Sequence, residues 1–589
     1  MTRAAGNEKI VDHVEVFAEE SQAESDRRRS AEVSQIPLAT PRVYVSRAEH
    51  VFPTLTPAQM ARIAAHGHVR KVTAGELLFD VGMPNDRFFV ITEGAINVSM
   101  TVDGLEDVLV THHAGGFTGE AGMLSARPTI VRCRAVESGE VIEVDRERLL
   151  GIVQTDAELS EIILRAFILR RVELIAHGHG DAVLVGSNHS SGTHRIKEFL
   201  TRNGHPYAYL DLDRDPDVQE LLDRFHVRVE DIPVVICRGV TVLRNPTNRE
   251  IAECLGFNEV LDPTHVRDVI IIGAGPAGLA AAVYGASEGL DVLVLESSAP
   301  GGQAGASSRI ENYLGFPTGI SGQDLAGRAY IQAQKFGAQM IIAQDAMRLA
   351  CVRKPFAIEV EGGPRVPARA VIIATGAQYR RLALDNLADY EGVGVYYGAT
   401  HLEAQFCVGE EVIIVGGGNS AGQAAVFLAE TARSVQVCVR AGSLADSMSR
   451  YLIRRIEQNP AIVVRTHTEI TALQGEPNLE RVLLRGPDGT ETRNVRHLFV
   501  MTGAVPGTQW LEECVALDEK GFIKTGPDLT RADLTAARWP LARAPHLLET
   551  SLPGVFAVGD VRSGSIKRVA SAVGEGSIAV SFVHRVLQE

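Results

Sequence analysis

A glycine-rich fingerprint that occurs twice is the feature that most constrains the fold of this 589-residue chain. Residues 268–278 read DVIIIGAGPAG and residues 411–421 read EVIIVGGGNSA. In each fingerprint an apolar strand passes through small residues into a helix, which lets backbone N–H groups and the helix N-terminus approach a pyrophosphate. The sequence therefore predicts two Rossmann-like units, each with a dinucleotide site.

The length and charge of the chain narrow its class further. A chain of this length, 45% apolar, has room for roughly three or four domains. The net charge of −15 argues against nucleic-acid binding as the main activity. Because the first residues lack a signal-peptide pattern and the uncharged run 269–286 contains a fingerprint, we expect a cytoplasmic protein without a membrane partner.

The seven cysteines are scattered, at positions 133, 237, 254, 351, 407, 438 and 514. No two of them have CxxC spacing, and the histidines show no consistent ligand spacing. The sequence thus predicts neither a disulfide framework nor a metal site.

The N-terminal part divides into an arm and a β-rich segment. Residues 1–45 are polar and are predicted to form a disordered or loosely packed arm. Residues 46–175 show short apolar strands with glycine turns, and the apolar spacing of 149–176 predicts an amphipathic helix. With the run FTGEAG at 117–122, this segment resembles the cyclic-nucleotide-binding domain of the catabolite-activator type, which implies a β-roll plus helices.

That resemblance implies a cyclic-nucleotide pocket at Gly119 and Glu120, with the glutamate on the ribose 2′-hydroxyl. The family's phosphate-binding arginine is missing, because its position holds Thr129, and Arg127 replaces it only if the loop is two residues shorter. Losing a charged contact worth about 1.5–3 kcal/mol weakens binding by one or two orders of magnitude. Ligand sensing and a role in dimerisation and docking both remain open.

Residues 180–262 read as β-α-β-α-β, with Pro233 directly before a strand. This order resembles the thioredoxin/glutaredoxin fold, in which that proline is cis and lies beside the redox cysteines. The run NHSSGT at 188–193 stands where the CxxC would begin the first helix, and it contains no thiol. We therefore predict a thioredoxin-like α/β domain that acts as a spacer or docking domain.

Residues 266–387 and 499–589 resemble, motif by motif and in order, the FAD-binding domain of small bacterial thioredoxin reductase and its flavoprotein relatives. The strand after the first fingerprint ends in Glu296, and an acid there binds the adenosine ribose of FAD. The later motifs include GGQ at 301–303 and VFAVGD at 555–560. The resemblance implies FAD contacts from Gly273, Gly275, Pro276, Ala277, Gly278, Glu296, Gly302, Gln303, Asn312, Thr375, Gly376, Gly559, Asp560, Arg568, Val569 and Ala570.

Residues 388–498 resemble the inserted nicotinamide domain of the same family. The strand that leads to Arg440 carries no terminal acid, which argues mildly against NADH. However, Ala441 and Ala445 stand where relatives that use NADPH have two further arginines. We predict NADPH, with NADH as the open alternative. The implied coenzyme contacts are Gly416, Gly418, Asn419, Ser420, Ala421 and Arg440.

The redox dithiol of thioredoxin reductases is missing. Its Cys-Ala-Thr-Cys run corresponds here to residues 398–401, Gly-Ala-Thr-His, so no thiolate can form there. His401 either donates a proton near the flavin or fills the space of a lost cysteine. Cys407 is either a displaced catalytic thiol or a packing residue.

The combined motifs predict an FAD-dependent NAD(P)H oxidoreductase that passes electrons from nicotinamide through flavin to an external acceptor. A small disulfide, a quinone, oxygen and a protein redox carrier are all open as that acceptor. We expect the N-terminal modules to regulate or localise the activity, and the resemblances imply a homodimer. The alternatives are a redox- or ligand-sensing signalling protein with low turnover and a ferredoxin-NADP reductase-like enzyme.

Overall fold

The computed structural model describes residues 48–102, 105–177, 180–188, 190–212, 214, 228, 231–445, 447–476, 478–511 and 514–589. The predicted N-terminal arm, and the second helix of the predicted β-α-β-α-β segment, fall outside these residues. Within the described part of the chain, no helix has both the length and the apolar character needed to cross a membrane.

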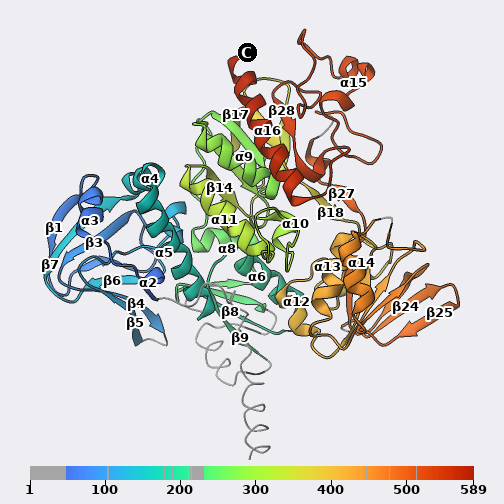
Figure 1. The fold of residues 1–589 in the computed structure, drawn as a ribbon, viewed down its shortest axis with the longest axis horizontal. Helices are drawn as coiled ribbons and strands as arrows, with labels where there is room; N and C mark the ends of the chain where they lie inside the picture. Colours follow the sequence, from blue (N-terminus) through green and yellow to red (C-terminus); the bar gives the residue numbers. More distant parts are fainter. Residues whose placement is uncertain are drawn as a thin grey trace, which may run out of the picture. The chain divides into compact units, whose positions relative to one another are not determined.

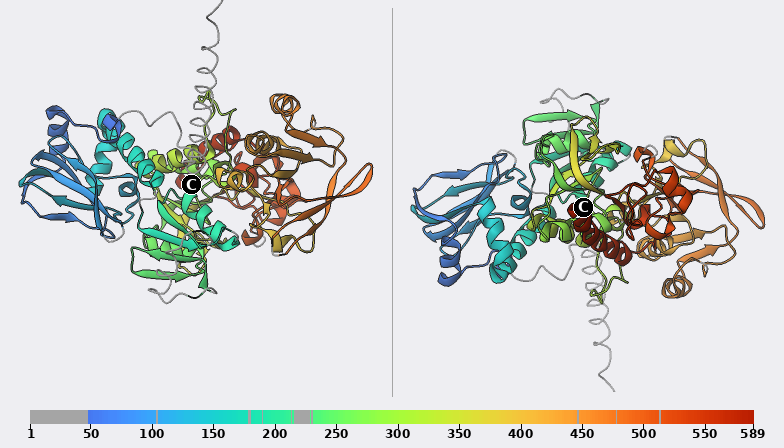
Figure 2. Two further views of the ribbon diagram at one scale, coloured as in Figure 1. Left: turned by 90° about the horizontal axis from the view of Figure 1, so that it is seen from below. Right: turned by 90° about the horizontal axis from the view of Figure 1, so that it is seen from above.

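Two antiparallel sheets, blue in Figure 1 and seen from two further sides in Figure 2, form the first β-rich domain. Their strand orders are β1-β7-β3 and β2-β6-β4-β5. Successive strand residues point to opposite faces, so Phe88 packs with the helices while Phe89 packs among residues of both sheets. The elements are α2 Ala48–Val51, α3 Pro57–Ala64, β1 His68–Val72, β2 Leu77–Phe79, β3 Arg87–Glu93, β4 Ile96–Val102, β5 Leu105–His112, β6 Arg132–Ala135 and β7 Gly139–Asp145.

The amphipathic helix predicted over 149–176 is in fact two helices, α4 Arg146–Thr155 and α5 Ala157–Ala176. Asp156 separates them with extended backbone (φ −105°, ψ 103°), and its carboxylate accepts a hydrogen bond from the Leu159 N–H at 3.0 Å. Aspartate favours this capping position over a helix interior. The prediction of one helix was wrong because the apolar spacing runs on across the cap.

A small α/β domain follows, with a four-stranded sheet in the order β11-β10-β8-β9. β8 and β9 are parallel and are joined through α6, whereas β10 and β11 are antiparallel. The peptide bond between Ile232 and Pro233, just before β10, is cis. The elements are β8 Ala182–Gly186, α6 Ser191–Arg202, β9 Tyr207–Asp211, β10 Val234–Cys237, β11 Thr241–Arg244 and α8 Asn248–Leu255.

The first fingerprint lies in a seven-stranded sheet with the path β14-β13-β12-β17-β16-β15, and β28 pairs with β17. β12 is apolar after its first two residues because both of its faces are buried: Val269 and Ile271 lie in one apolar cluster, and Ile270 and Ile272 lie in another. The elements are β12 Arg267–Ile272, α9 Pro276–Ser287, β13 Val292–Glu296, α10 Gly302–Gly305, α11 Gly322–Lys335, β14 Gln339–Ile342, β15 Ala346–Ala350, β16 Phe356–Val360, β17 Arg365–Ile373, β28 Val555–Ala557 and α16 Val569–Gln588.

The second fingerprint lies in a parallel five-stranded sheet with the order β19-β26-β20-β21-β22. A two-stranded ribbon, β18 with β27, marks where the chain leaves the first sheet and returns to it. The elements are β18 Ala377–Tyr379, β19 Val395–Tyr396, α12 His401–Phe406, β20 Glu411–Val415, α13 Asn419–Leu428, β21 Ser434–Cys438, α14 Arg450–Gln458, β22 Ile462–Arg465, β26 His497–Val500 and β27 Ala504–Pro506. An antiparallel sheet of β23 Glu469–Gln474, β24 Arg481–Gly486 and β25 Gly489–Arg493 completes this part.

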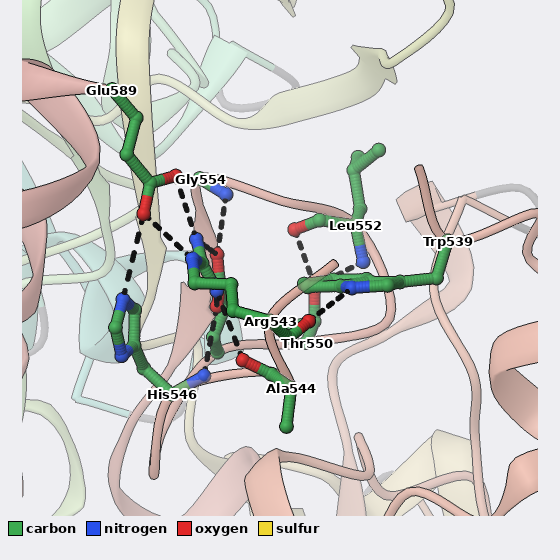
Figure 3. A network of polar contacts seen from close by, with 9 residues as sticks. Trp539, Arg543, Ala544, His546, Thr550, Leu552, Gly554 and Glu589 are labelled. Carbon is green, nitrogen blue, oxygen red and sulfur yellow. Dashed lines mark hydrogen bonds and ion pairs between the residues drawn. The ribbon is translucent and has the colours of Figure 1, made fainter. Parts of the chain in front are cut away.

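Helix α16 returns the C-terminal end of the chain to the first sheet, where it packs along α9 (Figure 1). The two helices approach closely at Gly576, where a Cβ atom would lie 2.1 Å from the carbonyl oxygen of Ala277. Figure 3 shows how the preceding loop is held. Arg543 pairs with the fully buried Glu549 at 2.6 Å and with Glu589 at 2.6 Å, so one guanidinium ties the loop to the end of α16.

Cys351 and Cys514 form a disulfide, which corrects the expectation that the cysteines are unpaired. Their Cα atoms are 6.1 Å apart although 163 residues separate them in sequence. Cys351 follows β15 and Cys514 lies in a later loop, so no sequence spacing could have paired them. The other five cysteines are free.

Candidate cofactor site

A cavity of about 1850 Å³ lies at the carboxyl ends of the parallel strands of both fingerprint sheets. This edge is where open α/β sheets bind nucleotides. Both fingerprints, α10 and the N-terminal end of α16 contribute to its lining. The cavity is continuous between the two sheets, so both fingerprints open into one space.

The first fingerprint combines one glycine that the fold requires with one that it does not. Gly273 has φ +101°, and a Cβ there would lie 2.5 Å from the carbonyl oxygen of Ala374. Gly275, the N-cap of α9, has ordinary extended backbone, and the nearest atom to a Cβ there is the Cα of Gly302, at 4.0 Å. The chain itself would accept a side chain at Gly275. The bare backbone therefore serves a ligand that comes close to it.

The second fingerprint repeats the same pair. Gly416 has φ +145°, and a Cβ there would lie 2.2 Å from the carbonyl oxygen of Met501. Gly418 caps α13 with extended backbone (φ −90°), and a Cβ there would meet no described atom within 4 Å. Two helix N-termini thus face the cavity without side chains in front of them, as a diphosphate requires.

Two carboxylates line the part of the cavity next to the first fingerprint. Glu296 ends β13 and accepts hydrogen bonds from the backbone N–H of Ala274 at 2.7 Å and of Ser298 at 2.9 Å. Asp560 follows β28. Burial raises the pKa of both carboxyl groups. Acceptors held this way can bind ribose or ribityl hydroxyls.

The cavity brings together most of the residues that the two fingerprints and their companion motifs predicted. Gly278 and Ala421 lie behind it instead: a Cβ at Gly278 would be 1.9 Å from the Gly273 carbonyl oxygen, so this glycine allows the helix to pack on the strand. Ala570 also lies off the lining, whereas Ala572 is on it. The lining residues among those predicted are Gly273, Gly275, Pro276, Ala277, Glu296, Gly302, Gln303, Asn312, Thr375, Gly376, Gly416, Gly418, Asn419, Ser420, Arg440, Gly559, Asp560, Arg568 and Val569.

The run that replaces the dithiol, residues 398–401, contributes Gly398, Ala399 and Thr400 to the cavity lining, and the preceding Tyr397 lines it as well. Glu403, which the sequence reasoning missed, lies beside them and accepts a hydrogen bond from the Thr400 N–H at 2.7 Å. Burial raises the pKa of Glu403. The signal was Thr-x-x-Glu, a capping box at the start of α12. Glu403 is therefore a titratable side chain on the lining, close to the run that replaces the dithiol.

The two residues predicted as catalytic are not placed alike. His401 is the first residue of α12, and its side chain lies outside the described structure. Cys407 is fully buried in the core of the second sheet, away from the cavity lining. Burial raises the pKa of its thiol to about 12. The structure therefore favours the packing role for Cys407 over the catalytic one.

Helix α6 of the small α/β domain also lines the cavity, which the sequence did not suggest. Its contribution is one face, whose members recur at helical spacing. A contact between segments 70 or more residues apart leaves no local pattern, so it could be found only in three dimensions. The lining residues of α6 include Ser191, Arg195, Glu198 and Arg202.

In the first domain, Glu120 is buried and pairs with Arg171 of α5 at 3.1 Å. Gly119 takes φ +101°, and its carbonyl accepts a hydrogen bond from Arg170 at 2.7 Å. Neither Thr129, at the position of the family's arginine, nor Arg127 pairs with this carboxylate: Thr129 donates to the Asp80 carbonyl, and Arg127 donates to Tyr330 at 3.3 Å. The cation beside Glu120 comes from the long helix instead.

The geometry agrees with what comparisons with known proteins find. Residues 267–576 match the family described as Pyridine nucleotide-disulphide oxidoreductase, and residues 69–156 match the family described as Cyclic nucleotide-binding domain. Thioredoxin reductase from Mycolicibacterium smegmatis is 35% identical over 327 residues, which are 55% of this chain and 97% of that protein. Thioredoxin reductase from Bacillus subtilis is 32% identical over 326 residues, 55% of this chain and 96% of that protein. The crystal structure of Lactococcus lactis thioredoxin reductase is 26% identical, covers 55% of this chain and all of its own (100%), and superposes with a TM-score of 0.49.

Proposed function

Because this chain belongs to the pyridine nucleotide-disulphide oxidoreductase family, we propose that it oxidises NADPH and passes the electrons to an acceptor outside the chain, without a dithiol of its own. When bound, FAD would accept hydride from the nicotinamide and release electrons to that acceptor. The remaining chemistry belongs to the residues of the cavity: the glycine N-caps admit the diphosphates, and Glu296 and Asp560 orient hydroxyls.

The observation that carries this proposal is the pair of open positions at Gly275 and Gly418 together with the thiol-free segment 397–400. The two glycines support two dinucleotides whose reactive rings meet in one cavity. Among the described residues, the only thiol on the lining is that of Cys438, which is buried at the end of β21 and is not bonded to another cysteine, and the disulfide of Cys351 and Cys514 is off the lining. Electrons must therefore leave for an external acceptor, and Glu403 can supply a proton to it.

We favour NADPH over NADH because Arg440 lines the cavity at the end of the second fingerprint sheet and carries the positive charge that a 2′-phosphate needs. Ser443 and Ser447 line the same region and offer hydroxyl donors, whereas Ala441 provides no second positive charge for the 2′-phosphate. A weak preference follows, smaller than an arginine cluster would give.

The other domains support this activity rather than perform it. Residues 46–175 form the cyclic-nucleotide-binding-like domain in this proposal, with Gly119 and Glu120 at its ligand site, and residues 180–262 form a thioredoxin-like domain. The strand order of residues 180–262, β11-β10-β8-β9 with cis-Pro233 before β10, supports the thioredoxin-like assignment. We further propose FAD-binding segments at 266–387 and 499–589, a nicotinamide domain at 388–498, and a homodimer.

An Arg171→Met variant is expected to destabilise the first domain by about 3–5 kcal/mol, because it leaves the buried Glu120 carboxylate without its cation. The double variant with Glu120→Gln is expected to lose much less, since it removes both charges together. Calorimetry of the three proteins measures the effect. Equal destabilisation by the single and double variants would show that the pair itself contributes nothing.

The function is tested by anaerobic titration and stopped-flow reduction of the full-length protein. We expect NADPH to bleach the flavin faster than NADH does. We also expect dithionite to reduce the protein with two electrons per FAD, because no dithiol at the flavin takes up a second electron pair. A matched variant with Gly398→Cys and His401→Cys restores the missing thiols and is expected to take up four electrons per FAD.

Two results would contradict the proposal. Failure of both coenzymes to reduce bound flavin would contradict the proposed oxidoreductase activity. Uptake of four electrons per FAD by the unaltered protein would mean that a thiol pair communicates with the flavin after all.

A further inference from the structure

One face of helix α6 forms a wall of the cofactor cavity, although α6 lies outside both family-matched ranges. The residues of this face are Ser191, Arg195, Glu198 and Arg202. Arg195 is already held within its own domain by Asn248 at 2.7 Å. Arg202, at the C-terminal end of the helix, instead reaches out of the domain toward the first fingerprint.

The end of α6 is fastened to the two loops that border Glu296 and Gly275. Arg202 donates from Nη2 to the Gly302 carbonyl oxygen at 2.9 Å, and Asn203 donates to the Ser298 carbonyl oxygen at 3.2 Å. Gly302 lies directly against the fingerprint, since a Cβ on it would be 3.1 Å from the Cα of Gly275. Only Gly302 therefore separates the Arg202 guanidinium from Gly275, where a diphosphate would bind.

The charge of Arg202 is only partly used by the chain. Its Nη1 pairs with Glu198 at 3.2 Å, and its side chain is 19% exposed. Its Nε is buried and has no hydrogen-bonding partner among the described residues. The Arg202 charge also opposes the rise in the pKa of Glu296 that burial causes. An arginine with a spare donor on the wall of an anion-binding cavity is suited to a ligand phosphate.

We propose that Arg202 of the α/β domain is part of the FAD site: it holds the Gly302 loop against Gly275 and sets a positive charge beside the FAD diphosphate. This inference rests on the proposed FAD binding. It gives the α/β domain, which carries no CxxC, a role as a structural part of the flavin site. Arg202 lies outside residues 267–576, the range that matches the reductase family.

The test compares FAD affinity in three full-length variants, measured by titrating apoprotein with FAD and following flavin fluorescence. Arg202→Met is expected to weaken FAD binding about tenfold or more, as loss of a charged hydrogen bond does. Arg202→Lys keeps the positive charge but loses the forked guanidinium donors, so its FAD affinity is expected to lie between those of Arg202→Met and the unaltered protein. Arg249→Met is the matched control, because Arg249 also joins the α/β domain to the FAD-binding part, through the Glu361 carbonyl at 3.2 Å, but lies off the cavity.

The outcomes separate this inference from the function itself. An FAD affinity of Arg202→Met within about twofold of the unaltered protein overturns the role of Arg202 while leaving the flavoprotein intact. Equal losses in Arg202→Met and Arg249→Met would also overturn it, since general loosening of the domain would then explain both. Absence of FAD binding by the unaltered protein would defeat the proposed function as well. Thermal unfolding of the three apoproteins shows whether each is folded.

Discussion

A Gly418→Val variant is expected to remain yellow with FAD but to be reduced by NADPH at least about 100-fold more slowly. A Cβ at Gly418 meets no described atom within 4 Å, and its φ of −90° suits any residue, so the fold tolerates the change. The added methyl groups instead occupy the space in front of the α13 N-terminus, where the coenzyme diphosphate has to bind.

Stopped-flow reduction with NADPH, followed by reduction with dithionite, measures this effect. Dithionite does not use the coenzyme site, so its reaction with the variant should match that with the unaltered protein. A variant that NADPH reduces normally would show that no diphosphate approaches Gly418, and the second fingerprint would then need another explanation.

A Gly275→Val variant is expected to have the converse defect, losing FAD while keeping its coenzyme domain. Gly275 has the same extended N-cap geometry (φ −69°), and the nearest atom to its Cβ position is 4.0 Å away. The side chain blocks the diphosphate of the flavin cofactor, so FAD affinity should fall at least about 100-fold. The ratio of flavin to protein absorbance after purification measures the loss.

The two valine variants serve as controls for each other, because each adds the same side chain to an equivalent N-cap. NADPH binding to the Gly275→Val apoprotein, measured by quenching of coenzyme fluorescence, should remain close to normal. If Gly275→Val unfolded the protein, or if both variants lost both cofactors, the reasoning from open Cβ positions would fail.

The contrast within each fingerprint explains why glycine appears there for two reasons. Gly273 and Gly416 need glycine for the chain itself, because a Cβ would strike the Ala374 or Met501 carbonyl oxygen. Gly275 and Gly418 need it for what binds. Sequence alone shows four similar glycines, and only the surrounding atoms separate a folding requirement from a binding requirement.

The missing dithiol changes which residues can act at the flavin end of the cavity. Tyr397, Gly398 and Thr400 line the cavity at the run that corresponds to the dithiol of thioredoxin reductases, and none of them can accept an electron pair. Glu403, held by Thr400, offers a proton without redox chemistry. An acceptor that takes both electrons and a proton, and that enters from outside the chain, fits this arrangement.

Motifs carried in one short stretch of chain could be predicted from residue order alone. The two fingerprints, the acid at Glu296 and the loss of both cysteines at 398–401 each depend on a single strand, turn and helix start. The same local reasoning misplaced the boundary at Asp156, because apolar spacing does not register a cap when the pattern continues beyond it.

Contacts between distant segments required the folded chain. The disulfide of Cys351 with Cys514, the pairing of Glu120 with Arg171, and the approach of Arg202 to Gly302 each join residues between 51 and 163 positions apart. No periodicity encodes such pairs, since each depends on how separate sheets and helices pack. Local motifs in the sequence thus predicted the cofactors, because each motif lies in one short stretch of chain. The packing of distant segments determined which helix and which charged side chain line the cavity and which cysteines form the disulfide.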